Sequence, residues 1–297
     1  MRSQFEILVL NLVNVPMLKV DVMNGSAEVQ RSRWSWPWVI TLTYLSVMLL
    51  LPAIALIQKS LSLGWAEVWR IATDPVAVSA YNVTFLTALA AAAVNGVMGT
   101  LIAWVLVRYS FPGRKVIDAV VDLPFALPTA VAGLALATLY SDRGWIGQWV
   151  APFGIKIAFT RTGVFVAMLF ISLPFIVRTL QPVLQELEPE IEAAARSLGA
   201  TPWQIFHRII LPPLIPPILT GVALGFSRAV GEYGSVVLIS SSIPFQDLIA
   251  PVLVFQRLEQ YDYAGATVIG TVLLLGSLTA LLVINRLQQW GRRYAIR

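Results

Sequence analysis

The sequence contains six apolar stretches, each close to the length of a bilayer-spanning helix. Such a helix needs about 20 predominantly apolar residues. Backbone N–H and C=O groups in lipid must be paired internally, and no stretch alternates apolar and polar residues as a barrel strand does, so we expect helices. The six stretches cover residues 38–58, 82–107, 117–140, 162–178, 213–238 and 263–285.

The composition agrees with membrane insertion. The 297 residues are 57% hydrophobic and 12% charged, whereas a soluble domain carries about a quarter charged residues. We therefore predict an all-α integral membrane protein with six transmembrane helices. Residues 144–155 are also apolar, but this segment is short and contains two Trp and three Gly, which favours a position at the membrane interface.

The side chains that usually carry enzyme chemistry are sparse. There is no cysteine, which excludes disulfides, thiolate nucleophiles and cysteine metal sites. His207 is the single histidine, and none of the four lysines follows a glycine-rich phosphate loop. We predict no catalytic residue, no metal site and no cofactor bound by this chain, so any ATP and Mg²⁺ would be used by a separate ATPase subunit.

The basic residues predict the topology. With both termini in the cytoplasm, fourteen Lys and Arg lie inside, six lie outside, and Arg228 stays within the membrane. This bias follows the positive-inside rule, so the net charge of +5 is read as a topology signal and not as a nucleic-acid site. Residues 1–35 are predicted to be a cytoplasmic tail of unassigned function, with Met17 and Met23 as alternative starts.

One long polar connector, residues 185–211, separates the fourth and fifth stretches. Pro189 suits the first turn of a helix, with Glu192 near its positive end and Arg196 four residues later on the same face. Gly199 suits a left-handed stop. The pattern predicts a first short helix that ends at this glycine.

A second short helix is predicted to begin directly afterwards. Thr201 can act as its N-cap, and Gln204 can complete a capping box. Four apolar side chains would share one face of this helix: Trp203, Phe206, Ile209 and Ile210. Two helices that meet at an elbow, with an apolar knob beside charges, favour a surface that docks another protein over an ordinary solvated loop.

Two charges fall inside the fifth apolar stretch. Arg228 and Glu232 are four residues apart, which places them on one helical face, and charges in a membrane are normally paired or face water. They could neutralise one another, or they could line a path in which Arg228 meets an anion; Asp122 is an alternative partner for Arg228. The residues predicted to line the path are Asp122, Arg228, Glu232, Tyr233 and Ser235.

The polar connector resembles the EAA coupling loop of ABC-importer permeases, whose pattern is E-A-A-x3-G-x9-I-x-L-P. Gly199, Ile209, Leu211 and Pro212 match the second half of the pattern. The acid lies one residue early, at Glu192, and Ala193 holds its register. The resemblance implies that the contact with the ATPase involves Glu192, Ala193, Ala194, Gly199, Thr201, Phe206, Ile209, Leu211 and Pro212.

Further runs are similar to the sulfate/thiosulfate permeases of this superfamily: residues 122–141 (DLPFALPTAVAGLALATLYS), 174–190 (PFIVRTLQPVLQELEPE), 227–240 (SRAVGEYGSVVLIS), 258–267 (LEQYDYAGAT) and 284–290 (INRLQQW). The likeness covers residues 36–297. It implies a type I importer fold in the bacterial cytoplasmic membrane.

The same resemblance implies partners and a mechanism. They are a second, related permease, two ATPase subunits and an extracytoplasmic sulfate-binding protein, and transport of sulfate or thiosulfate would proceed by alternating access. Import of molybdate or tungstate is the alternative. A secondary transporter driven by an ion gradient would need midplane carboxylates and repeated halves, and the sequence has one intramembrane pair and no convincing repeat.

Overall fold

The computed structural model describes residues 36–295, and each element in that range is a helix or a helical turn. The chain divides into two compact units, residues 1–51 and residues 52–297. In the first unit the described elements are α2 (Trp36–Leu45) and the π-helical turn η1 (Ser46–Leu50). Both are apolar, and their side chains are exposed. The predicted N-terminal tail, residues 1–35, lies outside the described residues.

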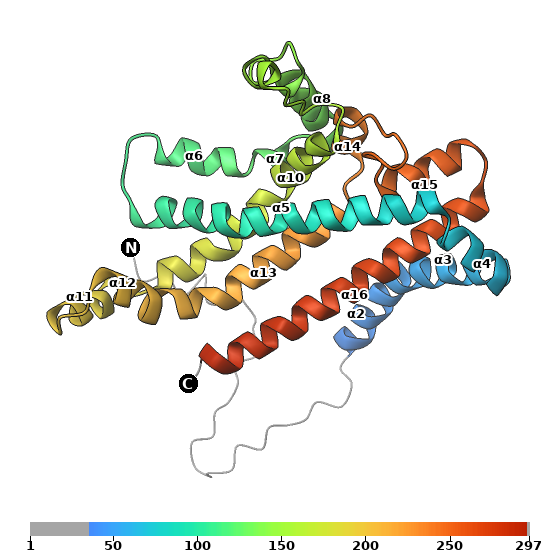
Figure 1. Cartoon of the computed structure of the whole chain (residues 1–297). Coiled ribbons are helices and arrows are strands. Elements are labelled where there is room, and N and C mark those ends of the chain that lie inside the picture. Colours follow the sequence, from blue (N-terminus) through green and yellow to red (C-terminus); the bar gives the residue numbers. More distant parts are fainter. Residues whose placement is uncertain (1–35, 296–297) are drawn as a thin grey trace, which may run out of the picture. The chain divides into compact units, whose positions relative to one another are not determined.

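The second unit contains the remaining helices, which Figure 1 shows in chain order. They are α3 (Leu51–Leu61), α4 (Trp65–Ala72), α5 (Pro75–Arg108), α6 (Arg114–Val121), α7 (Leu123–Ala126), α8 (Thr129–Tyr140), α9 (Gly147–Val150), the 3₁₀ turn η2 (Ala151–Phe153), α10 (Arg161–Glu186), α11 (Pro189–Ser197), α12 (Pro202–Ile205), the π-helical turn η3 (Phe206–Ile210), α13 (Leu211–Val230), α14 (Gly234–Ile239), α15 (Ala250–Glu259) and α16 (Tyr263–Ala295).

Five of the six predicted spans correspond to helices that are long and apolar enough to cross a membrane: Trp36–Leu61, Pro75–Arg108, Arg161–Glu186, Pro202–Val230 and Tyr263–Ile284. The predicted third span is instead divided among α6, α7 and α8. Leu127 is extended, as the residue before a proline tends to be, and α8 begins only after Pro128. The structure thus confirms the all-helical membrane fold. The stretch predicted as the third span is a broken helix, and the count of six spans stays a prediction.

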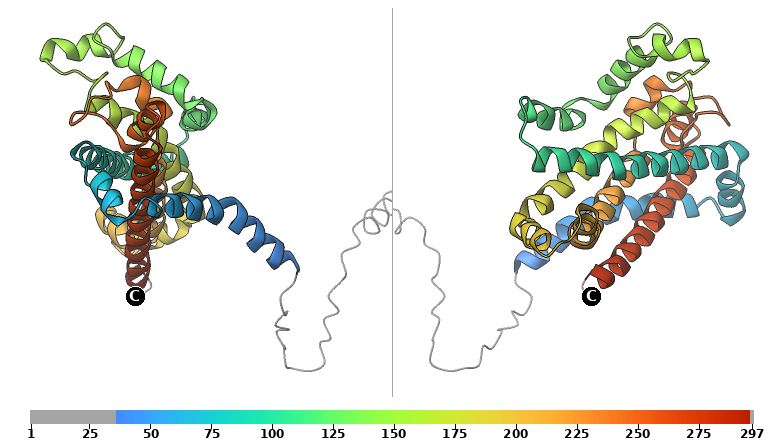
Figure 2. Two further views of the ribbon diagram at one scale, coloured as in Figure 1. Left: turned by 90° about the vertical axis from the view of Figure 1, so that its right-hand side faces the viewer. Right: turned by 60° about the vertical axis from the view of Figure 1, so that its left-hand side comes forward.

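Three long helices, α5, α10 and α13, pack directly against one another (Figure 2). Small residues permit the close approach: a Cβ added at Gly221 of α13 would lie 2.9 Å from Ile176 Cα of α10. A buried polar contact joins α5 to α10, where the Asn95 amide donates to the Leu169 carbonyl at 2.7 Å and to Ser172 Oγ at 2.9 Å. These contacts hold α5, α10 and α13 together as one bundle, called the frame below.

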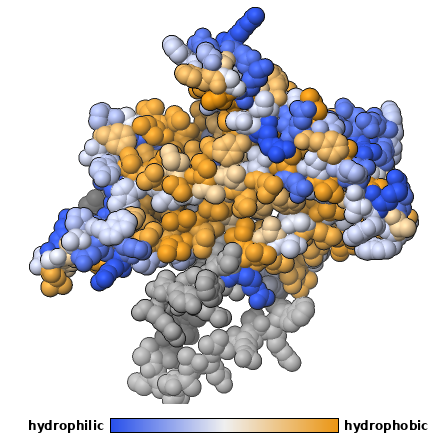
Figure 3. Space-filling view, viewed as in Figure 1, coloured by the Kyte–Doolittle hydropathy of each residue, from blue (hydrophilic) through white to orange (hydrophobic). Residues whose placement is uncertain are grey.

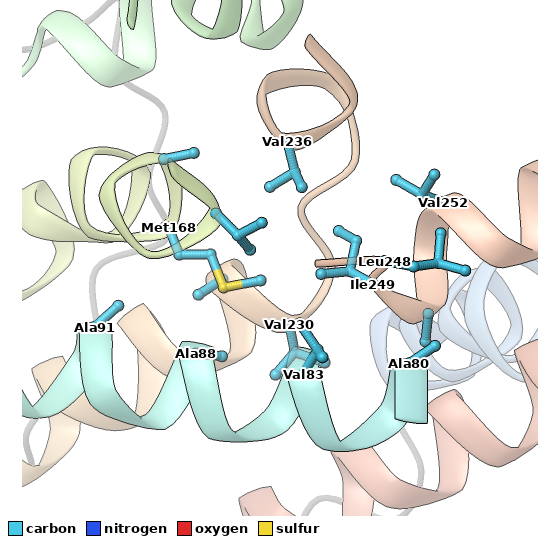
Figure 4. Packing of buried hydrophobic residues seen from close by; sticks show 14 of the residues in the cluster. Ala80, Val83, Ala88, Ala91, Met168, Val230, Val236, Leu248, Ile249 and Val252 are labelled. Atoms are coloured by element: carbon cyan, nitrogen blue, oxygen red, sulfur yellow. The ribbon is translucent and has the colours of Figure 1, made fainter. Parts of the chain in front are cut away.

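Buried apolar side chains form two clusters along this frame. The first joins α5, α10, α13, α14 and α15, and Figure 4 shows part of it. It includes Ala80, Val83, Ala88, Ala91, Met168, Val230, Val236, Leu248, Ile249 and Val252. The second gathers at the end of the frame where α11 and α12 lie, and joins α5, α10, α12 and α13 through Leu106, Ile176, Leu180, Ile205, Ile210 and Leu214. The connector between α10 and α13 is therefore packed onto the bundle.

The predicted end of the fifth span was wrong, and the fourth span lies in a helix longer than its apolar stretch. Helix α10 continues beyond Arg178, where that stretch ends, to Glu186, because Arg178 has partners and a paired charge need not end a helix. Helix α13 does not reach Leu238: it ends at Val230, with Gly231 as its C-cap, and α14 starts at Gly234. The chain is therefore unwound at the point where the sequence places its intramembrane charges.

The face of the molecule in Figure 3 is largely apolar over the long helices, and hydrophilic residues gather around α11 and α12 at its left. On α5 the exposed apolar side chains include Leu86, Leu89 and Val97. The segment predicted to lie at the membrane interface folds as α9 and η2 and exposes Trp145, Trp149 and Phe153. This distribution suits a protein surrounded by lipid.

Candidate functional site

The connector between α10 and α13 has the predicted elbow. Pro189 occupies the first turn of α11, and Gly199 adopts φ 83° directly after the helix. Ala200 N donates to the Ala195 carbonyl at 3.0 Å and Gly199 N to the Arg196 carbonyl at 2.9 Å, which is the Schellman arrangement. A Cβ at Gly199 would meet nothing within 4 Å, so the demand for glycine comes from the backbone angle alone.

The predicted capping box starts α12. Gln204 N donates to Thr201 Oγ1 at 3.3 Å, and Thr201 N donates to Gln204 Oε1 at 2.8 Å. The π-helical turn η3 follows and leads into α13, where Pro212 and Pro213 lack backbone donors. Both turns of the elbow are thus set by short-range rules.

The apolar knob differs from the prediction. The four side chains expected on one face are split: Ile210 is buried, and Phe206 packs edge-on against Trp104 of α5 with 6.2 Å between ring centroids. Trp203 is exposed and stacks on Phe206 at 6.0 Å. The most exposed large apolar side chain of the elbow is Leu198, the C-cap of α11, at 88% exposed, and its exposure was not predicted.

Glu192 is held between two arginines. Its Oε1 lies 2.7 Å from Arg108 Nη2 at the end of α5, and its Oε2 lies 3.5 Å from Arg196 Nη2. The Arg196 contact is the predicted pair within α11. The Arg108 contact joins two helices and was not predicted, because it depends on how α5 and α11 pack. Ala193 and Ala194, by contrast, are exposed.

Four of the five residues predicted to line a path meet at the break between α13 and α14. Arg228 Nη1 lies 2.6 Å from Glu232 Oε2, as predicted, although Glu232 is beyond the helix end and not on its face. Glu232 is 1% exposed, and its Oε1 accepts hydrogen bonds from Ser235 N and Oγ, both at 2.8 Å. The carboxylate therefore neutralises Arg228 and stabilises the start of α14.

Two further contacts complete this break. Tyr233 packs against Phe255 of α15 with 5.1 Å between ring centroids. Gly133 of α8 lies so close to the Ser235 backbone that a Cβ would overlap it, so α8 and α14 are in direct contact. About a third of the Arg228 side chain remains exposed. The site thus combines a fixed carboxylate with an accessible guanidinium.

Asp122 is not part of this site, and the alternative that it pairs with Arg228 is wrong. Its two oxygens accept hydrogen bonds from Arg178 Nε at 2.7 Å and Nη2 at 2.6 Å. Asp118, on the preceding turn, also lies 2.7 Å from Arg178 Nη1. A guanidinium can donate two parallel hydrogen bonds to the two oxygens of one carboxylate, as Arg178 does to Asp122. The cluster of Arg178, Asp118 and Asp122 therefore fixes α6 to α10.

Replacing Arg178 by methionine is expected to destabilise the fold by about 2 kcal/mol, because two neighbouring carboxylates lose their shared cation. The loss would be measured as the fraction of protein that stays monodisperse after heating. Lys115→Met, which removes a positive charge from an exposed position on α6, the helix that carries Asp118, is the matched control. If the two variants lost the same amount of stability, the effect would come from the change in net charge and not from the contacts of Arg178.

The sequence and the fold were compared with known proteins. Residues 95–293 match the family described as the inner membrane component of binding-protein-dependent transport systems, and the chain belongs to that family. It is 74% identical to the sulfate transport system permease protein CysT of Synechocystis sp. (strain ATCC 27184 / PCC 6803 / Kazusa), over 88% of this chain and 91% of the relative. It is 66% identical to the protein of the same description from Synechococcus elongatus (strain ATCC 33912 / PCC 7942 / FACHB-805), over 89% and 95%.

Solved structures agree on the fold. A bacterial ABC transporter that imports the acidic polysaccharide alginate matches with TM-score 0.69 at 17% identity, covering 85% of this chain and 93% of that one. The MetNI methionine ABC transporter in an inward-facing conformation matches with TM-score 0.51 at 20% identity, covering 72% and 95%. The helices described above are thus those of a type I ABC-importer permease. Among the described residues, no group of three or more His, Asp or Glu side chains could hold a metal ion.

Proposed function

We propose that the chain is the permease subunit of an ATP-driven importer that moves sulfate and thiosulfate across the bacterial cytoplasmic membrane. The observation that carries the proposal is the exposed elbow at residues 189–210, which is built onto one end of a bundle of membrane-length helices. The solute is inferred from the sulfate permease relatives, the first of which is 74% identical over 88% of this chain.

In this proposal the elbow docks on an ATPase subunit. Leu198 and Trp203 offer exposed apolar surface beside the exposed acid Glu190 of α11, and such a surface suits a partner with an apolar groove and basic residues at its rim. Gly199, Thr201, Ile209, Leu211 and Pro212 hold the elbow in shape. Both termini and the elbow lie in the cytoplasm, in keeping with the distribution of Lys and Arg.

The solute path is proposed to pass the break between α13 and α14. Glu232 uses both oxygens on Arg228 and Ser235, so it presents no free charge that would repel an anion. Arg228 keeps part of its guanidinium accessible, and a guanidinium suits a tetrahedral oxyanion because it offers parallel donors. Tyr233 and Ser235 position this arginine through the loop that they anchor.

The partners follow from the family and the proposed solute. We propose a second, related permease beside this one, two ATPase subunits that bind ATP and Mg²⁺, and an extracytoplasmic protein that delivers sulfate. This chain supplies the path and binds no nucleotide itself. ATP binding closes the ATPase pair, and the elbows transmit that motion to the helices around the path by alternating access.

Uptake of radiolabelled sulfate by cells that lack the gene, with and without a plasmid copy, tests the proposal. Uptake is expected to disappear with the gene, return with the plasmid, and be blocked by excess thiosulfate but not by molybdate. Normal sulfate uptake together with lost molybdate uptake would keep the fold and the elbow but assign a different oxyanion.

A further inference from the structure

The acidic residue of the elbow points into the molecule. Glu192 is 14% exposed in its side chain, whereas Glu190 on the same helix and Glu188 at its N-cap are exposed. Its closest partner is Arg108 on α5, at 2.7 Å. A carboxylate in this position is not free to meet a second protein.

Arg108 depends on that carboxylate. Its side chain is 17% exposed, and its guanidinium carbon lies 5.2 Å from the centre of the Trp104 ring. The buried Nε and Nη2 make no hydrogen bond within the described part of the chain, so Glu192 is the charge that compensates this cation. Removing one member of a buried pair leaves the other charge uncompensated, which is costly.

The position of the acid in the sequence explains its direction. The pattern of the elbow places an acid six residues before the glycine, where this chain has Ala193, and successive residues of an α-helix are rotated by about 100°. Ala193 is exposed, whereas Glu192 faces α5. The shift of one residue therefore turns a carboxylate from the outer face of α11 toward the bundle.

We propose that the ion pair between Arg108 and Glu192 is a strut that fixes α11 to the end of α5, and that Glu192 is a positioning residue within this chain and not a contact to the ATPase. The inference deepens the proposed function and rests on the elbow being the coupling element. Helix α5 runs from Pro75 to Arg108, so a displacement of α11 acts on the end of a helix that packs against both α10 and α13. Trp104 completes the strut, because it contacts Phe206 after α12 and the guanidinium of Arg108.

The first test is functional and uses the assembled transporter in proteoliposomes. Glu192→Ala and Arg108→Ala are each expected to lower the sulfate transported per ATP hydrolysed by about tenfold, because either change breaks the pair. The exchange Arg108→Glu with Glu192→Arg is expected to restore most of this ratio. Glu186→Ala, a change of an exposed acid at the end of α10 and outside the elbow, is expected to leave it unchanged. If Glu192→Ala releases the ATPase while Arg108→Ala does not, and the exchange fails to restore transport, Glu192 is an ATPase contact and the strut is wrong.

The second test does not depend on transport. The natural chain has no cysteine, so a spin label on Ser197→Cys reports the motion of α11 alone in the full chain embedded in nanodiscs. Label mobility is expected to rise in Glu192→Ala and to return toward the starting value in the exchanged pair. Unchanged mobility in Glu192→Ala would overturn the strut whatever the solute is. Raised mobility with no sulfate transport by the parent protein would keep the strut and reject the proposed solute.

Discussion

Sulfate uptake is expected to fall by about tenfold or more when Gly199 is replaced by valine, because an L-residue in the left-handed conformation costs about 1–2 kcal/mol and a β-branched one more. Gly199 has φ 83°, and the Schellman bonds that close α11 depend on that angle. Strain there would unfold the elbow or rotate Leu198 away from its present position. Uptake and the amount of ATPase that copurifies would both be measured.

The matched control is Gly199→Asn. Asparagine tolerates the left-handed conformation, and the space beside Gly199 is open, so this variant is expected to keep most of the uptake. Loss in both variants would mean that the ATPase contacts the glycine backbone itself. Retention in both would contradict the elbow as the coupling element.

Arg228→Ala is expected to cause the second large loss. Glu232 is 1% exposed, and breaking a buried pair by removing one partner costs about 3–5 kcal/mol, reduced here because Arg228 is partly accessible. We expect a lower yield of folded protein and almost no uptake. The folded fraction would be measured by size exclusion after extraction from the membrane.

Combining Arg228→Ala with Glu232→Gln separates the two roles of the arginine. Glutamine removes the buried charge but keeps an oxygen for Ser235, so the folded fraction is expected to recover. Uptake should remain lost if Arg228 contacts the anion. Recovery of both folding and uptake would limit Arg228 to neutralising Glu232.

The sequence predicts most accurately those features that depend on near neighbours. The stop at Gly199 and the capping box of Thr201 with Gln204 follow from local backbone rules, and the structure has both. The pairing of Arg228 with Glu232 was one of the alternatives that their spacing of four allowed. It is present although α13 ends between them, because Gly231 N still donates to the Ser227 carbonyl at 3.4 Å and Glu232 N to the Ala229 carbonyl at 3.1 Å, which continues the helical turn.

The sequence could not predict which charged side chains form ion pairs when they lie far apart along the chain. Arg178 looked like the charge that ends a span, yet it binds Asp122 and Asp118 of a helix some 60 residues earlier. The spacing of four between these two aspartates was a usable signal, since two acids on one helical face require a cation or water. No such signal linked Arg108 to Glu192, because only the packing of α5 against the elbow brings them together.

Sulfate accumulation in proteoliposomes that hold this chain with its partner permease, the ATPase and the binding protein decides whether transport is driven by ATP. We predict accumulation only when ATP is supplied on the ATPase side and the binding protein on the other, with Gly199→Val inactive in the same assay. Accumulation driven by a proton or sodium gradient without ATP would contradict the account and make the chain a secondary transporter.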